Sequence, residues 1–237
     1  MLKVNSALIL YFTAFILYVI AVLIDSDNLE LFSKPIIIPS IYYFYYISVR
    51  GKIDYLFSLW VLSFFIGEIL HLISREEFNV SGLIFLLIPY FIILFFIFQD
   101  LIYYLKKKKI NLNTFSFYVI VMLLVYLIFN ALMMMIEEKS FEFFIYFLYG
   151  ILLLLMGIWA FIMLINYNNR TILYTGFMVG CFLLSDLFFV FSKKIPDLIA
   201  LKLINVATQE LSFFCYISYF VYRTKFKLYG KRDIQDW

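Results

Sequence analysis

Long apolar segments separated by short polar connections run through the whole of this 237-residue sequence. An α-helix needs about 20 predominantly apolar residues to cross a bilayer, because each residue adds about 1.5 Å along its axis. The sequence therefore predicts an all-α integral membrane protein, with residues 1–237 forming one domain of eight transmembrane helices. The predicted helices are 6–24, 35–49, 53–73, 80–104, 112–136, 142–165, 171–192 and 197–222. The second is short, and Pro35 is interpreted as its first-turn proline.

Composition excludes several classes of protein. The chain is 65% hydrophobic and only 15% charged, which no soluble globular domain matches. Its net charge of +3 lies in loops and the tail, so it indicates topology and not nucleic-acid binding. Cys181 and Cys215 lie within apolar runs and are predicted to be reduced core residues. A single histidine is too few for a typical zinc site, so no metal, no cofactor and no soluble partner are predicted.

The basic residues set the predicted orientation. With the N-terminus inside, 13 of the 19 Lys and Arg residues lie on the cytoplasmic side, including the run at 106–109. Acidic residues favour the opposite side, and the alternation holds through every loop. We therefore expect both termini to be cytoplasmic, and the membrane to be the inner membrane of a bacterium.

Two carboxylates lie inside the predicted spans. Asp186 follows Ser185 in the apolar stretch 176–191, and Glu68 lies in the third helix. An ionised carboxylate in hydrocarbon costs several kcal/mol unless it is paired, wetted or protonated. Both residues are predicted to lie roughly 8–9 Å inside the outer end of their helices. Because they share this depth, we expect them to meet in one polar site.

Further polar residues are predicted to complete this site. Lys34 opens the second helix on the same side, and His71 lies three residues after Glu68, on a neighbouring helix face. A polar stripe at offsets 0, 3, 4, 7, 11 and 14 follows the eighth helix, and such a stripe faces protein or a water-filled cavity. The stripe consists of Asn205, Thr208, Gln209, Ser212, Tyr216 and Tyr219. A structural role fits as well: Glu68 can pair with Lys34, His71 can lie at the interface, and the stripe can hydrogen-bond between helices.

The order and placement of these residues resemble the YhhN-type lysoplasmalogenase family over nearly the whole chain. The matching motifs are Lys34-Pro35, Ser63-x-x-x-Gly67-Glu68, Gly82-x-x-Phe85, Phe182-x-x-Ser185-Asp186 and Gln209. Two positions depart from the family pattern. Glu68 stands where the family usually has aspartate, and Pro89 where it usually has histidine. No titratable group remains at position 89 unless the neighbouring Tyr90 substitutes for the histidine.

The resemblance implies a membrane hydrolase that cleaves the vinyl-ether bond of lysoplasmalogens to a fatty aldehyde and a glycerophospho-alcohol. Such a reaction needs a proton delivered to carbon and water added to the resulting oxocarbenium ion. By this analogy Glu68 and Asp186 are the catalytic pair, and which of them is the acid is left open. Lys34 is expected to meet the substrate phosphate. His71, Ser185, Asn205 and Gln209 are expected to bind the lysophospholipid.

Two other classes of function compete with this hydrolase. A non-catalytic relative that binds or senses a lysolipid explains the proline at position 89. A small proton-coupled transporter could use the carboxylates as a relay, although transporters often show repeated halves and none is visible here.

Overall fold

The computed structural model describes residues 5–73, 79–106, 115–136, 140–167 and 169–229, and within these ranges the chain forms helices and no strands. The helices are α1 (Ser6–Leu23), α2 (Asp27–Ser48), α3 (Tyr55–Ile73), α4 (Asn79–Leu105), α5 (Phe115–Met134), α6 (Ser140–Asn166), α7 (Arg170–Lys194) and α8 (Ile199–Tyr229). The predicted all-α class is confirmed. Six of these helices, α1 and α3 to α7, are long and apolar enough to cross a membrane.

The start of α2 corrects the sequence-based prediction. The helix begins at Asp27, eight residues before the predicted start, so Pro35 and Pro39 both lie inside it. Asp27 and Glu30 occupy its first turn, where negative charge is favourable next to the positive end of the helix dipole. Lys34 therefore does not open the helix. It lies about two turns inside, roughly 10 Å along the axis from the first residue.

The other boundaries lie within about three residues of the prediction, except at the end of the chain. There α8 continues to Tyr229, seven residues beyond the predicted end. The basic side chain of Arg223 does not end the helix, because it is buried against α4. Residues 112–114, predicted as the first turn of α5, fall outside the described residues.

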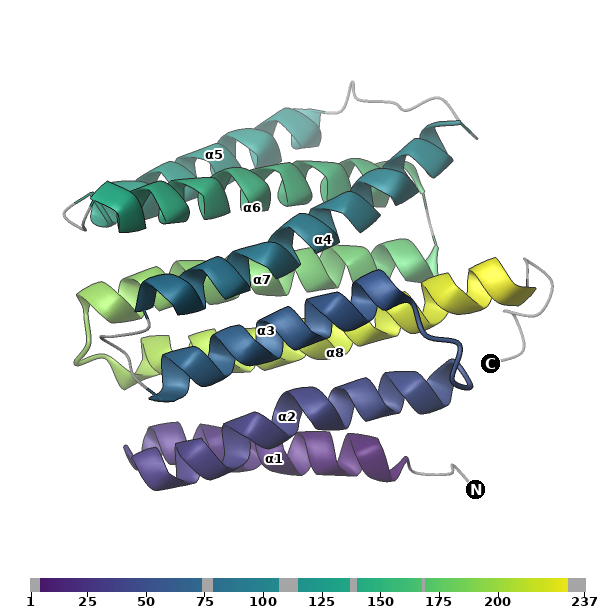
Figure 1. Cartoon of the computed structure of the whole chain (residues 1–237). Helices are drawn as coiled ribbons and strands as arrows, with labels where there is room; N and C mark the ends of the chain where they lie inside the picture. Colours follow the sequence, from purple (N-terminus) through teal and green to yellow (C-terminus); the bar gives the residue numbers. More distant parts are fainter. Residues whose placement is uncertain (1–4, 74–78, 107–114, 137–139, 168, 230–237) are drawn as a thin grey trace.

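The helices pack in a closed order that leaves α5 on the outside. In the order α1, α2, α3, α4, α6, α7, α8, each helix contacts the next, and α8 contacts α1. α5 packs against α6 and α7 instead. Helices that follow one another in sequence run in opposite directions, so α1 begins and α8 ends at the same end of the bundle (Figure 1). We call this the terminus end, and the opposite one the cavity end.

Aromatic side chains fill the terminus half of the bundle. Phe57 of α3 stacks on Phe220 of α8 with ring centroids 4.4 Å apart, and Trp60 lies 4.0 Å from Tyr216. Phe96 of α4 closes on the same Phe220 at 4.7 Å. All five rings are at most 2% exposed. These five rings therefore form a packed aromatic core in the terminus half of the bundle.

Small residues bring α3 and α4 close together at the level of the cavity. A Cβ atom added to Gly67 would lie 2.8 Å from Cγ of Leu86 and 3.2 Å from its backbone nitrogen. Gly82 of α4 faces the same turn, because a Cβ there would lie 3.5 Å from the carbonyl oxygen of Gly67. Gly67 and Gly82 therefore let α3 and α4 approach each other closely.

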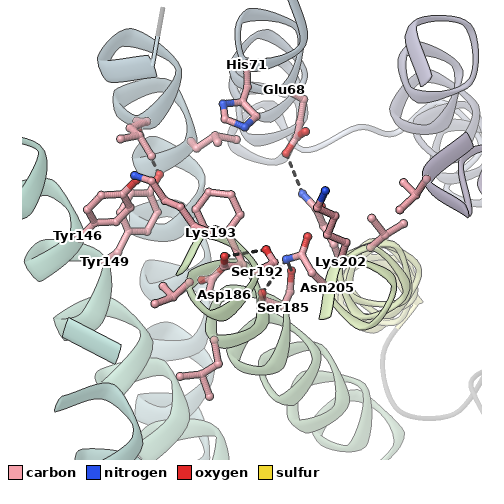
Figure 2. Close-up of a pocket in the computed structure, with 18 of the residues that line it drawn as sticks. Glu68, His71, Tyr146, Tyr149, Ser185, Asp186, Ser192, Lys193, Lys202 and Asn205 are labelled. Atoms are coloured by element: carbon pink, nitrogen blue, oxygen red, sulfur yellow. Dashed lines mark hydrogen bonds between the residues drawn. The ribbon is translucent and has the colours of Figure 1, made fainter. Parts of the chain in front are cut away.

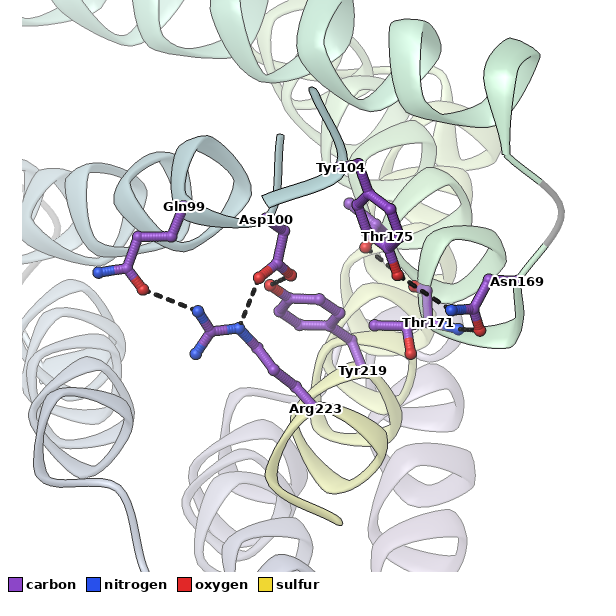
Figure 3. Close-up of polar contacts among 8 residues, drawn as sticks. All are labelled: Gln99, Asp100, Tyr104, Asn169, Thr171, Thr175, Tyr219 and Arg223. Atoms are coloured by element: carbon purple, nitrogen blue, oxygen red, sulfur yellow. Dashed lines mark hydrogen bonds and ion pairs between the residues drawn. The ribbon is translucent and has the colours of Figure 1, made fainter. Parts of the chain in front are cut away.

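A polar cluster ties α4 to α8 in the terminus half (Figure 3). Arg223 forms an ion pair with Asp100 at 3.0 Å and donates to Gln99 at 2.8 Å. The Tyr219 hydroxyl donates to the second Asp100 oxygen at 2.5 Å. The Arg223 guanidinium also lies 4.7 Å from the ring centroid of Phe96, so a cation–π interaction joins the ion pair to the aromatic core. The tyrosine at the end of the predicted α8 stripe thus serves helix packing.

Candidate functional site

A cavity of about 510 Å³ occupies the cavity half of the bundle. Its size lies within the usual range of about 300–1,000 Å³ for small-molecule sites. One wall carries charged and polar groups from α1, α2, α3, α7 and α8, and the other is mainly apolar and comes from α4, α5 and α6. Figure 2 shows Glu68 and His71 entering this space from α3, and Ser185 and Asp186 from α7. The cavity is therefore amphipathic.

The charged wall is organised around Glu68. Its Oε2 atom lies 2.7 Å from Nζ of Lys34, and the two side chains are only 9% and 12% exposed. Gln209 of α8 donates to the other carboxylate oxygen at 2.8 Å. The lysine nitrogen also lies 5.4 Å from the ring centroid of Tyr18 on α1. This arrangement joins α1, α2, α3 and α8 around one buried ion pair.

Asp186 belongs to a separate hydrogen-bond network. The Tyr90 hydroxyl from α4 donates to both of its oxygens, at 2.7 and 3.0 Å. Tyr90 is 4% exposed and meets Tyr149 of α6 edge to face, with ring centroids 4.9 Å apart. The Tyr149 hydroxyl donates to the backbone carbonyl of Leu83 at 2.7 Å. Two packed tyrosines therefore hold the Asp186 carboxyl at the boundary between the polar and apolar walls.

The remaining predicted residues also line the cavity. Asn205 of α8 donates to the backbone carbonyl of Ser185 at 2.7 Å and contacts its hydroxyl at 3.2 Å. This pair clamps α7 to α8 next to Asp186. His71 lies on the cavity wall with its ring 6.3 Å from that of Phe189 on α7.

All seven predicted site residues thus surround one cavity, in two clusters. Glu68, Lys34 and Gln209 form one cluster, and Asp186, Ser185 and Asn205 form the other. His71 lines the wall as well. Their functional roles stay predictions. The structure adds an observation that bears on these roles, because Lys34 already forms an ion pair with Glu68. A ligand phosphate would have to share Lys34 with Glu68 or displace Glu68 from it.

Sequence reasoning missed several residues of the site. The sequence indicates Tyr90 only as a substitute for the histidine missing at position 89, and it does not predict that Tyr90 is the direct partner of Asp186. Lys193 and Lys202, which the sequence analysis does not place in the site, line the cavity with Asp27 and Glu30 at the start of α2. The apolar wall was missed altogether, because residues that border a cavity have the same composition as residues that fill a core.

Glu210 lies behind the site. It is 2% exposed, its Oε2 atom makes no hydrogen bond, and it does not line the cavity. The Tyr11 hydroxyl donates to its backbone carbonyl and links α1 to α8. The hydroxyls of Thr208 and Ser212 bond to carbonyls of their own helix. Of the predicted α8 stripe, only Asn205 and Gln209 reach the cavity.

Comparison of the chain with protein-family models, with curated proteins and with solved structures finds no match. Among the described residues, no group of three or more His, Cys, Asp or Glu side chains could hold a metal ion. The site must therefore be interpreted from its own chemistry.

Proposed function

We propose that this protein is a membrane-embedded lysolipid hydrolase that cleaves a vinyl-ether bond, as the sequence resemblance to lysoplasmalogenases implies. The observation that carries the proposal is a single amphipathic cavity lined by two carboxyl groups, Glu68 and Asp186, each held by its own hydrogen-bond partner. A ligand that fits such a cavity has a charged head and an apolar tail. Single-chain phospholipids have this character.

We infer that all eight helices cross the membrane, although α2 and α8 are not among the six that are long and apolar enough by themselves. Charged residues of these two helices lie in the interior of the bundle, as Lys34 and Arg223 do. Such burial makes a polar transmembrane helix possible. The excess of basic residues in the predicted inner loops favours cytoplasmic termini, and hence an outward-facing cavity in the inner membrane of a bacterium.

The two carboxyl clusters suit different steps of the reaction. Glu68, held by the Lys34 cation, is assigned as the base, and Asp186, whose partner is a neutral hydroxyl, as the acid. Asp186 protonates the vinyl carbon remote from the ether oxygen, which leaves an oxocarbenium ion. Water adds to this ion and gives a proton to Glu68.

The resulting hemiacetal then breaks. Glu68 returns its proton to the ether oxygen, and Asp186 recovers one from the hemiacetal hydroxyl. The products are the aldehyde and the glycerophospho-alcohol, and one water is consumed. The Lys34 ammonium has three donors, so it can hold Glu68 and a phosphate oxygen together.

Aldehyde release from a vinyl-ether lysolipid tests the proposal. Asp186→Asn keeps the shape of the side chain but removes the acid, and it should lower the rate by roughly 10²–10⁴. Tyr90→Phe removes the hydroxyl that holds Asp186, and about a tenfold loss is expected. Matched controls are Asp197→Asn and Tyr118→Phe, which change exposed residues away from the cavity.

Full activity of folded Asp186→Asn, or absence of aldehyde with the wild-type protein, would rule out the hydrolase. The second candidate, a non-catalytic lysolipid-binding protein, would then apply. It is favoured by one observation: Glu68 is already engaged by both Lys34 and Gln209. Binding of the intact lipid without its cleavage would identify this function.

A further inference from the structure

One face of α5 lines the cavity, while the helix as a whole is the least buried of the candidate spans. Ile128, Ala131, Leu132 and the following Met135 border the cavity at offsets 0, 3, 4 and 7. These offsets place them on a single helix face. On its other faces α5 is exposed, as at Met122, whose side chain is 75% exposed. The inward face of α5 therefore forms part of the cavity wall.

Residues of α4 and α6 complete this apolar wall. Leu83 and Leu86 come from α4, and Leu153 from α6. Gly150 of α6 lets α5 approach, because a Cβ there would lie 3.1 Å from Cγ2 of Ile128. No charged residue of α4, α5 or α6 lines the cavity among the described residues. The apolar wall meets the polar one at Tyr90 and its partner Asp186.

We propose that this apolar wall is the binding site of one long hydrocarbon chain, and that Ala131 sets the chain length that fits. A polar solute gains nothing from these side chains, whereas each buried methylene contributes about fourfold in affinity. Ala131 has the smallest side chain on the α5 face, so a larger residue there takes space from the chain. The inference rests on the proposed binding of a lysolipid but not on its hydrolysis.

Binding of ester-linked single-chain phosphocholine lipids tests the inference, because these lipids carry no vinyl ether to cleave. Chains of 12, 14, 16 and 18 carbons would be compared by native mass spectrometry and by the ligand-dependent rise in Tm of the purified protein. Ala131→Phe should weaken binding of the 18-carbon lipid at least tenfold and that of the 12-carbon lipid much less. Ala200→Phe, at an exposed position of α8, is the matched control.

Leu132→Ala provides a second variant that removes volume from the same wall. It should favour longer chains over shorter ones relative to the wild type, and it keeps the test decisive where Ala131→Phe does not fold. An unchanged chain-length profile in both folded variants, or no binding by the wild type, overturns the inference. Binding with the expected profile but without aldehyde release from a vinyl-ether lipid supports the chain site and rejects the hydrolase.

Discussion

The buried ion pair between Lys34 and Glu68 gives a stability prediction that can be worked out from the structure. Its 2.7 Å contact lies between side chains that are 12% and 9% exposed, so both charges have lost most of their solvent. Removing one partner leaves the other buried without compensation, which typically costs about 3–5 kcal/mol. Glu68→Leu and Lys34→Met should each lower the free energy of unfolding by about that amount. Glu68→Leu also leaves Gln209 without its acceptor, at a cost of about 1 kcal/mol.

The double variant Lys34→Met/Glu68→Leu should lie far closer to the wild type than either single variant. Replacing both charges by apolar groups of similar volume is often neutral or stabilising, so a coupling free energy of about 3 kcal/mol or more is expected. Unfolding in mixed detergent micelles, followed by tryptophan fluorescence, measures all four proteins. Lys52→Met, at an exposed position between α2 and α3, should change stability by less than about 0.5 kcal/mol.

Additive single variants, each within about 1 kcal/mol of the wild type, would refute this reasoning. Such a result would mean that water in the cavity solvates both charges, and that the pair contributes as little as an exposed salt bridge.

Two further predictions concern helix packing and topology. Gly67→Ala should destabilise the protein by about 1–3 kcal/mol, because the new methyl group collides with Leu86. Gly180→Ala should be neutral or slightly stabilising in the same unfolding assay, since no atom lies within 4 Å of its added Cβ. Equal losses in both variants would contradict the close contact of α3 with α4. Reporter fusions after Lys109 and Trp237 should both be cytoplasmic, and an external reporter at either site would overturn the orientation.

The helices could be predicted from the sequence because most of them carry a long apolar segment bounded by polar residues. The start of α2 could not, because Pro35 is equally compatible with a first turn and with the interior of a membrane helix. The residues before it, Asp27 and Glu30, resemble a polar loop when no neighbouring helix is known. Local composition thus located the segment but not its first turns.

The site was predictable where a polar group stands out against an apolar background. Glu68 and Asp186 met this condition, and counting residues placed them at a common depth. Tyr90 did not, because one tyrosine among 20 carries little information until its hydroxyl is placed against Asp186. The sequence offers the pairing of Lys34 with Glu68 only as a structural alternative, because the pairing depends on how far each helix extends.

The solid aromatic half of the bundle has an electrical consequence. Phe57, Trp60, Phe96, Tyr216 and Phe220 are at most 2% exposed and pack together between the cavity and the terminus end. In an energised membrane most of the voltage would fall across these rings. A charged headgroup entering from the cavity end would cross little of that voltage, although a full crossing is worth about 2.3 kcal/mol per charge at 100 mV. Occupancy of the cavity should therefore be almost independent of the membrane potential.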